Sequence, residues 1–394
     1  MSERIGFVHY PHWPDHARLE TMPFALQSVR ALNRAGWPVD LFVWQSQTSA
    51  LQEALGPGVW LREPGRLALS LPKRLQSYGH ALRYGFARNY RCLFGLGQIG
   101  IFVASAMARV AHCPLVYLND ELPSGCPDTV WRRMERRAAQ RADFIVTPDS
   151  CRNPQLLTEL GLAQDTPACA LYNVPVVDHP VPSIDWRRRL GIPHDRHYVV
   201  HAGSVADWAQ VPEVLATVPY WPQDVVLVLH SRGGEAGDRY RRQLGHLGIE
   251  GRVFWSTEPL SEPALHSLLA ASLASLGLYR NSGPNIDLIG YSSGKIMRSL
   301  ACGTPVIASA IGSLDFVTQH ALGVQVTHPA EIAGALPGLI AEREALRERC
   351  RRFIGTVVSF PSAWKSFTHR FGEVTGVDLD APPQRRPASE RGGM

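Results

Sequence analysis

The chain has 394 residues, a length that fits two domains of comparable size better than one. Apolar residues make up 45% and charged residues 19%, so each half can bury a core, which excludes an intrinsically disordered protein. The net charge of +5 is mild and spread along the chain, so no nucleic-acid partner is predicted. Arginine supplies 37 of the 40 basic residues, and the only lysines are Lys73, Lys295 and Lys365.

The seven cysteines are scattered and form no CxxC pair, which indicates reduced thiols in a cytoplasmic protein and no zinc site. The sequence begins with a strand-like run rather than an apolar leader, so no signal peptide is expected. Residues 92–108 form the longest stretch without charge or histidine, but this stretch contains Gln98 and three glycines. We therefore expect it to be a buried strand–loop–helix unit and not a membrane span.

Strand-like and helix-like segments alternate through the first half of the chain. They occupy residues 5–10 (strand), 22–35 (helix), 39–44 (strand), 91–118 (strand, glycine-rich turn, helix and strand), 129–141 (helix) and 144–147 (strand). This βαβ rhythm predicts a parallel sheet. We expect a first Rossmann-like domain over residues 1–175.

A proline-rich segment without periodicity interrupts this rhythm, and we place a linker over residues 176–195. The second half resumes the alternation at residues 198–202 (strand), 211–217 (helix), 225–230 (strand), 253–255 (strand), 262–271 (helix), 274–277 (strand), 295–301 (helix) and 306–309 (strand). This pattern predicts a second Rossmann-like domain over residues 196–360. We expect a helix over 361–375 to cross back to the first domain and residues 376–394 to be a disordered tail. The predicted fold is α/β, with two tandem domains facing across a cleft that binds ligands at the carboxyl ends of the strands.

A polar loop leads into the helix predicted at residues 295–301, and this junction carries the strongest chemical signal. Ser292 or Ser293 can cap the helix, and Gly294 lets the backbone approach a ligand closely. The free N–H groups of the helix start favour an anion, and Lys295 adds a full positive charge. These features predict a phosphate or diphosphate site. The alternative is a well-capped helix with a solvated lysine.

Ser-Gly-Lys-Ile at 293–296, with Ala-Cys-Gly-Thr-Pro-Val-Ile-Ala-Ser at 301–309, resembles the donor-site signature of retaining nucleotide-sugar glycosyltransferases with the GT-B fold, of the family 4 type. Weaker parallels follow in order along residues 4–372: Glu121 after Val116-Tyr117-Leu118-Asn119-Asp120, Asn173-Val174-Pro175, Gly203-Ser204 and Leu229-His230. The resemblance implies a polysaccharide-biosynthesis enzyme. It would move a sugar from a nucleoside-diphosphate donor in the second domain to a glycan or lipid-linked acceptor in the first.

From the signal and the resemblance together we assign site residues. The expected catalytic residues are Lys295, Arg298 and His12. The expected donor-binding residues are Gly203, Ser204, His230, Arg232, Trp255, Asn285, Ser292, Ser293 and Gly294. The expected acceptor-side residues are Asp120 and Glu121. No cofactor or metal is expected, because Lys295 and the helix start supply positive charge and the only DxD motif, at 378–380, falls in the predicted tail.

The sequence departs from the family pattern at two places. Many relatives carry two glutamates eight positions apart, the second commonly holding the donor ribose, and Gly290 and Arg298 stand there in this chain. Relatives also place an arginine and a lysine shortly after the glycine turn, where this chain has Asp-Trp-Ala-Gln at 207–210. These departures leave a non-catalytic sugar-nucleotide-binding homologue as an alternative.

A second alternative comes from Gly95-Leu96-Gly97-Gln98-Ile99-Gly100, a GxGxxG sequence with Asp120 about twenty residues later. This spacing is typical of NAD-dependent oxidoreductases. The motif follows an earlier βαβ unit and a short strand, which makes the dehydrogenase alternative less favoured.

Two further segments carry weaker signals. His9, His12 and His16 have a spacing that permits a metal site, but loop histidines are more common as polar contacts. Arginines and Lys73 stand among leucines and aromatic residues through residues 62–91, which predicts either a solvated helix pair or a basic surface for anionic lipid. The second possibility would place the protein peripherally at the inner face of the membrane.

Overall fold

The computed structural model describes residues 3–10, 19, 22–43, 51–52, 55–63, 73–125, 129–177, 180–231, 240 and 248–382. The chain divides into two compact units. The first unit comprises Met1–Tyr172 and Phe360–Met394, and the second comprises Asn173–Ser359. The C-terminal helix therefore belongs to the first unit, whereas the chain between residues 173 and 359 forms the second.

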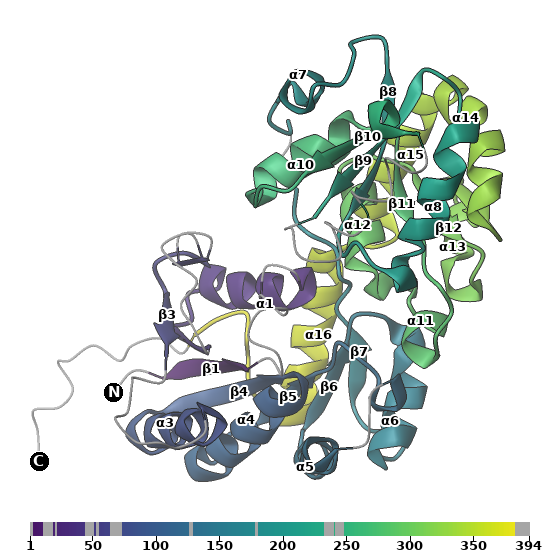
Figure 1. Cartoon of the computed structure of the whole chain (residues 1–394). Helices are drawn as coiled ribbons and strands as arrows, with labels where there is room; N and C mark the ends of the chain where they lie inside the picture. Colours follow the sequence, from purple (N-terminus) through teal and green to yellow (C-terminus); the bar gives the residue numbers. More distant parts are fainter. Residues whose placement is uncertain are drawn as a thin grey trace, which may run out of the picture. The chain divides into compact units, whose positions relative to one another are not determined.

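The first unit contains a seven-stranded parallel sheet in the order β3-β2-β1-β4-β5-β6-β7 (Figure 1). Its strands are β1 (Arg4–His9), β2 (Val39–Phe42), β3 (Val59–Arg62), β4 (Tyr90–Leu96), β5 (Leu115–Leu118), β6 (Phe144–Thr147) and β7 (Ala168–Ala170). The order reverses between β1 and β4, which pair directly. Ligands of open α/β sheets bind at such a switch point, beyond the carboxyl ends of the strands.

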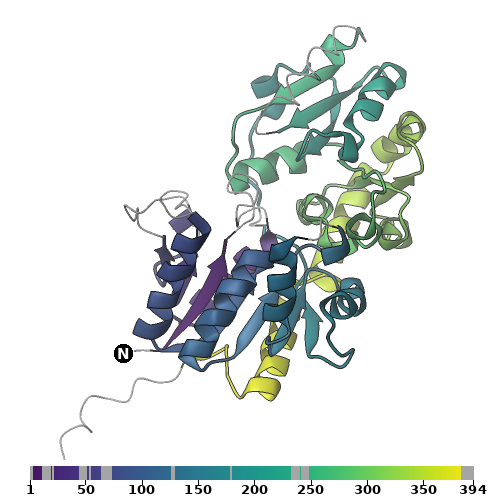
Figure 2. The same cartoon turned by 60° about the horizontal axis from the view of Figure 1, so that its bottom comes forward.

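Helices cover both faces of this sheet (Figures 1 and 2). They are α1 (Pro23–Arg34), α3 (Lys73–Ala87), α4 (Gly97–Ala111), α5 (Val130–Ala139), α6 (Asn153–Leu160) and α16 (Phe360–Thr375). Helices α1 and α16 pack on one face, where Phe24 of α1 and Phe367 of α16 share a core with Phe7 of β1 and Phe94 of β4. Helices α3, α4 and α5 pack together on the other face.

Helix α4 lies unusually close to the sheet because glycines face it. A Cβ atom on Gly100 would lie 2.6 Å from the backbone oxygen of Val8, and one on Gly95 would lie 2.5 Å from the Cα atom of Ile101. Gly97 begins the helix with a φ of +66°, a conformation that L side chains rarely adopt. Backbone packing thus accounts for all three glycines of the GxGxxG sequence without a dinucleotide.

The second unit contains a six-stranded parallel sheet in the order β10-β9-β8-β11-β12-β13. Its strands are β8 (His197–Ala202), β9 (Val225–His230), β10 (Val253–Ser256), β11 (Ala274–Gly277), β12 (Val306–Ser309) and β13 (Gly323–Val326). The sequence order again reverses at the centre, here between β8 and β11. The two sheets therefore share one topology, as the repeated rhythm of the sequence predicts.

Helices also cover both faces of the second sheet. They are α7 (Trp186–Leu190), α8 (Val211–Thr217), α10 (Glu262–Ala271), α11 (Pro284–Asp287), α12 (Gly294–Ala301), α13 (Phe316–Gln319), α14 (Ile332–Ala341) and α15 (Arg343–Thr356). Leu215 of α8 and Leu336 of α14 share one core with Leu227 of β9. Leu268 of α10 shares the opposite core with Val228.

The predicted α/β fold with two Rossmann-like units is confirmed, but the prediction of a disordered tail from residue 376 is wrong for its first part. Val377 and Leu379 are buried in the core of the first unit. The indole Nε1 of Trp37 donates a 3.0 Å hydrogen bond to the carbonyl of Leu379. Apolar side chains at these two positions hold the segment after α16 in place, and residues 383–394 lie outside the described part of the chain.

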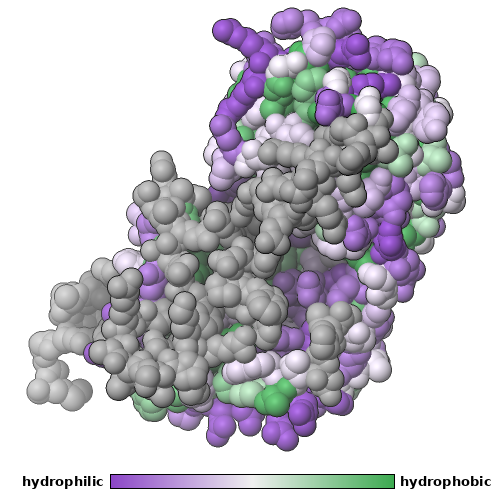
Figure 3. Space-filling model, viewed as in Figure 1, coloured by the Kyte–Doolittle hydropathy of each residue, from purple (hydrophilic) through white to green (hydrophobic). Residues whose placement is uncertain are grey.

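On the face shown in Figure 3, hydrophilic residues predominate over the described surface, with smaller hydrophobic patches between them. Among the described residues, none of the helices is both long enough and apolar enough to cross a membrane. The stretch 92–108 forms parts of β4 and α4, so the expected strand and helix are present, but α4 begins directly after β4 and the expected loop between them is absent.

Candidate functional site

The candidate site of the second unit lies at its topological switch point. Strand β8 ends at Ala202 and leads into Gly203, and strand β11 ends at Gly277 and leads into Leu278 and Tyr279. Gly203 has a φ of +151°, and its N–H donates a 3.1 Å hydrogen bond to the carbonyl of His230 at the end of β9. The carboxyl ends of three neighbouring strands therefore meet where the start of α12 also lies.

Helix α12 begins at this edge with a side-chain cap. The Oγ atom of Ser293 accepts a 3.2 Å hydrogen bond from the backbone N–H of Ile296, so Ser293 is the cap that the sequence left open between two serines. The same Oγ atom lies 2.5 Å from the hydroxyl of Tyr279. The side chain of Asn173 donates a 2.9 Å hydrogen bond to the carbonyl of Ser292. The loop before the helix is thus fixed from two sides.

Lys295 lies in the first turn of α12 and turns back toward the end of β11. Its Nζ atom donates a 3.3 Å hydrogen bond to the carbonyl of Leu278. The same atom lies 4.3 Å from the ring centroid of Tyr279 and 5.9 Å from that of Trp208. Among the described residues no carboxylate forms an ion pair with Lys295, and burial lowers its pKa to about 7.

Two buried histidines lie near this lysine or at the neighbouring strand end. His201 of β8 lies with its Nε2 atom 2.9 Å from the carbonyl oxygen of Ser204, and burial together with Lys295 lowers its pKa to about 3. His201 is therefore neutral at physiological pH and does not compete with Lys295 as a cation. His230 lies with Nδ1 3.0 Å from the Oγ atom of Ser256.

The remaining residues assigned to the donor site are more scattered. Trp255 is half-buried on β10, two strands away from the switch point, and Asn285 lies in the short helix α11. Arg298 lies one turn after Lys295 on α12 and is close enough to lower the pKa of the Cys302 thiol, which burial raises to about 12. Arg232 and His12 lie outside the described residues, as does His16 of the predicted histidine cluster.

A second polar group occupies the corresponding edge of the first unit. Asp120 follows β5, and burial, with the charge of Glu121, raises its pKa to about 6. His9 at the end of β1 acts in the opposite direction on this carboxyl group. Arg152 donates a 2.6 Å hydrogen bond from Nη1 to the backbone carbonyl of Asp120. Asp120 and Glu121 thus lie beside the switch point of the first sheet, after the strand next to β4, where an acceptor site is expected.

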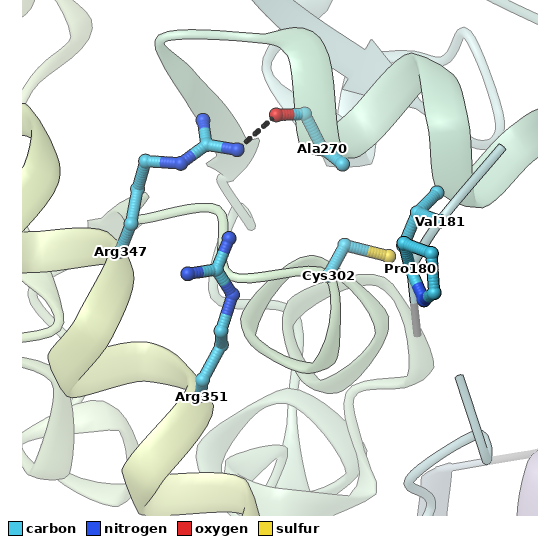
Figure 4. A pocket seen from close by; sticks show the side chains of 6 residues that line it. All are labelled: Pro180, Val181, Ala270, Cys302, Arg347 and Arg351. Carbon is cyan, nitrogen blue, oxygen red and sulfur yellow. Dashed lines mark hydrogen bonds between the residues drawn. The ribbon is translucent and has the colours of Figure 1, made fainter. Parts of the chain in front are cut away.

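The second unit also has a hollow at the opposite end of α12, with a volume of about 570 Å³ (Figure 4). Its lining residues are Pro180, Val181, Ala270, Cys302, Arg347 and Arg351. Arg347 donates a 2.5 Å hydrogen bond from Nη2 to the carbonyl of Ala270, and Arg343 donates to the next carbonyl, that of Ala271. The arginines therefore donate to the last carbonyl groups of α10, which is a common role of basic side chains at the C-terminal end of a helix. Since this role accounts for their position, we assign no ligand to the hollow.

Tyr279, Trp208 and His201 are the site residues that the sequence did not single out. Tyr279 lies two residues after the end of the buried strand β11, and this position is the signal that could have identified it. Among the described residues no group of three His, Cys, Asp or Glu side chains is placed to hold a metal ion.

Comparisons with known proteins identify the fold. A scan against protein families and a search of curated proteins both found no match. Solved structures do match. HepE of Anabaena in complex with UDP and glucose aligns with a TM-score of 0.72 at 14% identity, over 94% of this chain and 100% of that chain. WaaG, a glycosyltransferase involved in lipopolysaccharide biosynthesis, gives 0.62 at 13%, over 95% and 100%.

A putative UDP-N-acetylglucosamine 2-epimerase from Listeria monocytogenes aligns with a TM-score of 0.62 at 13% identity, over 98% of this chain and 100% of that chain. The chain therefore has the GT-B fold, and its similarity to glycosyltransferases of that fold extends over nearly its whole length. Because the same fold occurs in a protein described as an epimerase, the reaction must be inferred from the site.

Proposed function

We propose that the chain transfers a sugar from a nucleoside-diphosphate donor, bound at the switch point of the second unit, to a glycan or lipid-linked acceptor. The observation that carries this proposal is the ammonium group of Lys295, placed beside the capped start of α12 with no acidic partner among the described residues. Two sources of positive charge face the same place, and a diphosphate would neutralise both.

The chemistry of such a transfer depends on the leaving group. The bond between the anomeric carbon and the diphosphate breaks, a bond to the acceptor oxygen forms, and the hydroxyl proton of the acceptor is released. Negative charge develops on the departing diphosphate, and in this proposal Lys295 and the N–H groups at the start of α12 stabilise it. This arrangement supports a reaction that needs no metal cofactor, and the resemblance to retaining glycosyltransferases supports retention.

Similarity to HepE supports a uracil-containing donor, because that protein was solved with UDP and with UDP-glucose. The acidic pair Asp120 and Glu121 at the switch point of the first unit is the acceptor site that we propose.

A non-catalytic sugar-nucleotide-binding protein is the second candidate. It is favoured by Gly290 and Arg298, which stand where many relatives carry glutamates. Gly290 is buried, and its N–H donates a 3.2 Å hydrogen bond to the Oγ atom of Ser313. This position therefore has no side chain that could contact a donor as the glutamate of relatives would.

We also propose that the protein binds anionic membranes weakly through the end of α3. Phe86 is 75% exposed, and Arg83 and Arg88 beside it are exposed as well. An exposed aromatic ring can enter the headgroup region while arginines contact anionic lipid.

Incubation with UDP-sugars and measurement of released UDP, with and without EDTA, tests the proposed reaction. Acceptor-dependent UDP release that survives EDTA is expected, and NMR of the product should show the anomeric configuration of the donor. Binding of UDP without any turnover would favour the non-catalytic candidate. A sugar nucleotide epimerised at C2, without transfer of the sugar to an acceptor, would identify the protein as an epimerase and not a transferase.

A further inference from the structure

Tyr279 makes contacts in three directions at the candidate donor site. Its hydroxyl lies 2.5 Å from Oγ of Ser293, the residue that caps α12. Its ring centroid lies 4.3 Å from Nζ of Lys295. Its backbone N–H donates a 2.9 Å hydrogen bond to Oγ of Ser309, at the end of β12. One side chain therefore joins the helix cap and the cation, and its backbone fixes both to the sheet.

We propose that Tyr279 is the positioning residue of the donor site: its ring face seats the ammonium of Lys295, and its hydroxyl holds the cap Ser293. This proposal rests on the proposed function, since it assigns a role within that site. Tyr279 would keep the Lys295 ammonium and the N–H groups at the start of α12 in fixed positions relative to each other before a ligand binds. Such preorganisation is what makes electrostatic stabilisation effective.

Trp208 is the second aromatic ring near the ammonium, with its centroid 5.9 Å from Nζ of Lys295. Its ring stacks on that of Tyr279 with centroids 6.1 Å apart and planes 15° apart. Its carbonyl accepts a 2.8 Å hydrogen bond from the N–H of Arg280, and Gln210 donates a 2.9 Å bond to the carbonyl of Tyr279. The turn after β8 is thus clamped to the chain after β11, across the switch point.

The surroundings of the ammonium favour an aromatic seat over an ion pair. The ammonium of Lys295 faces His201 of β8, which is neutral. At the end of β11 it faces the carbonyl of Leu278 and the phenol of Tyr279. Burial raises the pKa of this phenol to about 12, so it too is neutral. Arg298 is the next cation along α12. A cation over the face of an aromatic ring is attracted by the ring quadrupole and keeps its charge available for an anion.

The small number of lysines allows a direct test. In protein labelled with ¹³C at the lysine Cε position and measured at a pH well below 7, where Lys295 is protonated, three signals are expected, and the Lys295→Arg variant identifies the one from Lys295. Ring currents shift nuclei above an aromatic face upfield. In the ligand-free wild type we expect the Lys295 signal to lie upfield of the signal of the exposed Lys365. The Tyr279→Phe variant keeps the ring, so its Lys295 signal should also lie upfield. In Tyr279→Leu the Lys295 signal should move to the position of the Lys365 signal.

Tyr198→Leu is the matched control, since it removes another buried tyrosine of the second unit, whose hydroxyl donates a 2.8 Å bond to the carbonyl of Leu268. This variant should leave the Lys295 signal in place. An unshifted Lys295 signal in the wild type, or one that Tyr279→Leu does not move, would overturn the seat whether or not the chain is a transferase.

Kinetics then test whether Tyr279 acts through Lys295. We expect Tyr279→Leu to lower kcat/KM about 10- to 100-fold and Lys295→Ala about 30- to 1000-fold. In the Lys295→Ala background, Tyr279→Leu should cost less than about threefold more, because residues that act as a unit are not additive. Independent, multiplicative losses would contradict the positioning role. Absence of turnover in the wild type, with the shifted NMR signal present, would instead refute the proposed reaction alone.

Discussion

The ammonium of Lys295 donates a hydrogen bond of 3.3 Å to the backbone carbonyl of Leu278, at the end of the central strand β11. A backbone carbonyl holds the cation in position but does not neutralise it, whereas a carboxylate would. The charge therefore remains available to a ligand at the start of α12. The predictions below follow from this arrangement and from the packing of the two units.

Replacing Lys295 should lower catalysis without lowering the free energy of unfolding, because burial makes the contribution of its ammonium group to stability unfavourable. We expect Lys295→Ala to lose about 2–4 kcal/mol of transition-state stabilisation, the typical result of removing one preorganised electrostatic contact. Lys295→Arg should recover only part of this loss, because a planar guanidinium does not reproduce a compact ammonium. Steady-state kinetics and thermal melting measure both quantities. An unfolded Lys295→Ala protein would make the residue structural, and near-wild-type turnover would remove it from the site.

Binding of a nucleoside diphosphate should take up a proton. Burial lowers the pKa of Lys295 to about 7, and a bound diphosphate would raise it again. Affinity should therefore fall as the pH rises above about 7, by up to about tenfold per pH unit. Calorimetric titrations of UDP at pH values from 7 to 9, in buffers of different ionisation enthalpy, measure the effect. The Lys295→Ala variant should show no such fall, and a pH-independent wild-type affinity would argue against the linkage.

The same pKa determines how Lys295 contributes to stability. An exposed lysine titrates at about 10.5, so between about pH 7 and 10.5 the unfolded chain binds more protons at this position than the folded chain. The contribution of Lys295 to the free energy of unfolding is therefore unfavourable below pH 7 and improves as the pH rises through this window.

The first unit depends on a buried charge cluster around Asp40. This carboxylate is fully buried and accepts hydrogen bonds from Arg4 at 2.7 and 2.9 Å, from Arg62 at 2.7 Å and from the hydroxyl of Tyr90 at 3.0 Å. We expect Asp40→Asn to lower the free energy of unfolding by about 3–5 kcal/mol, because it leaves buried arginines without their counter-ion. Chemical denaturation measures this loss.

Glu3 provides the control for the Asp40 prediction. It pairs with Arg91 at 4.0 Å on a solvent-exposed part of the same sheet. Glu3→Gln should change the free energy of unfolding by less than about 1 kcal/mol, as is usual for exposed pairs. If Asp40→Asn were as mild as Glu3→Gln, the cluster would not be holding the edge of the first sheet.

Membrane binding should depend on Phe86. With anionic vesicles at low salt we expect the wild type to float and Phe86→Ser to float much less, and high salt should release both. Tyr220→Ser is the matched control, since Tyr220 is 79% exposed but lies in the second unit. Equal flotation of Phe86→Ser and wild type, or no flotation at low salt, would leave α3 as a solvated surface helix.

Much of the fold could be predicted because its central strands are apolar runs bounded by turns. Strand β9 at Val225–His230 has the predicted bounds, and all six of its residues are buried. The strands that were not predicted, β3, β7 and β13, lie at sheet edges, where half-buried side chains give no clear period. Tertiary contacts decide such short segments, as they also decide the packed residues 376–382.

The site divides in the same way. The position of Lys295 at the helix start and a serine cap before it are local features, so the sequence predicted them, although it left the cap open between Ser292 and Ser293. The contacts of Lys295 with Tyr279 and Trp208 join loops that follow two different strands. Only the reversal of strand order between β8 and β11 brings these loops together, and the sequence does not state that order.

Calorimetric titration of UDP, GDP, ADP and CMP into the wild type and into Lys295→Ala at pH 7 tests the central claim most directly, because it asks whether the switch point of the second unit binds a nucleotide diphosphate at all. The account predicts that at least one diphosphate binds the wild type and that the variant binds it at least about tenfold more weakly, a difference of about 1.4 kcal/mol. Failure of all three diphosphates to bind the wild type, or equal affinity for both proteins, would contradict it.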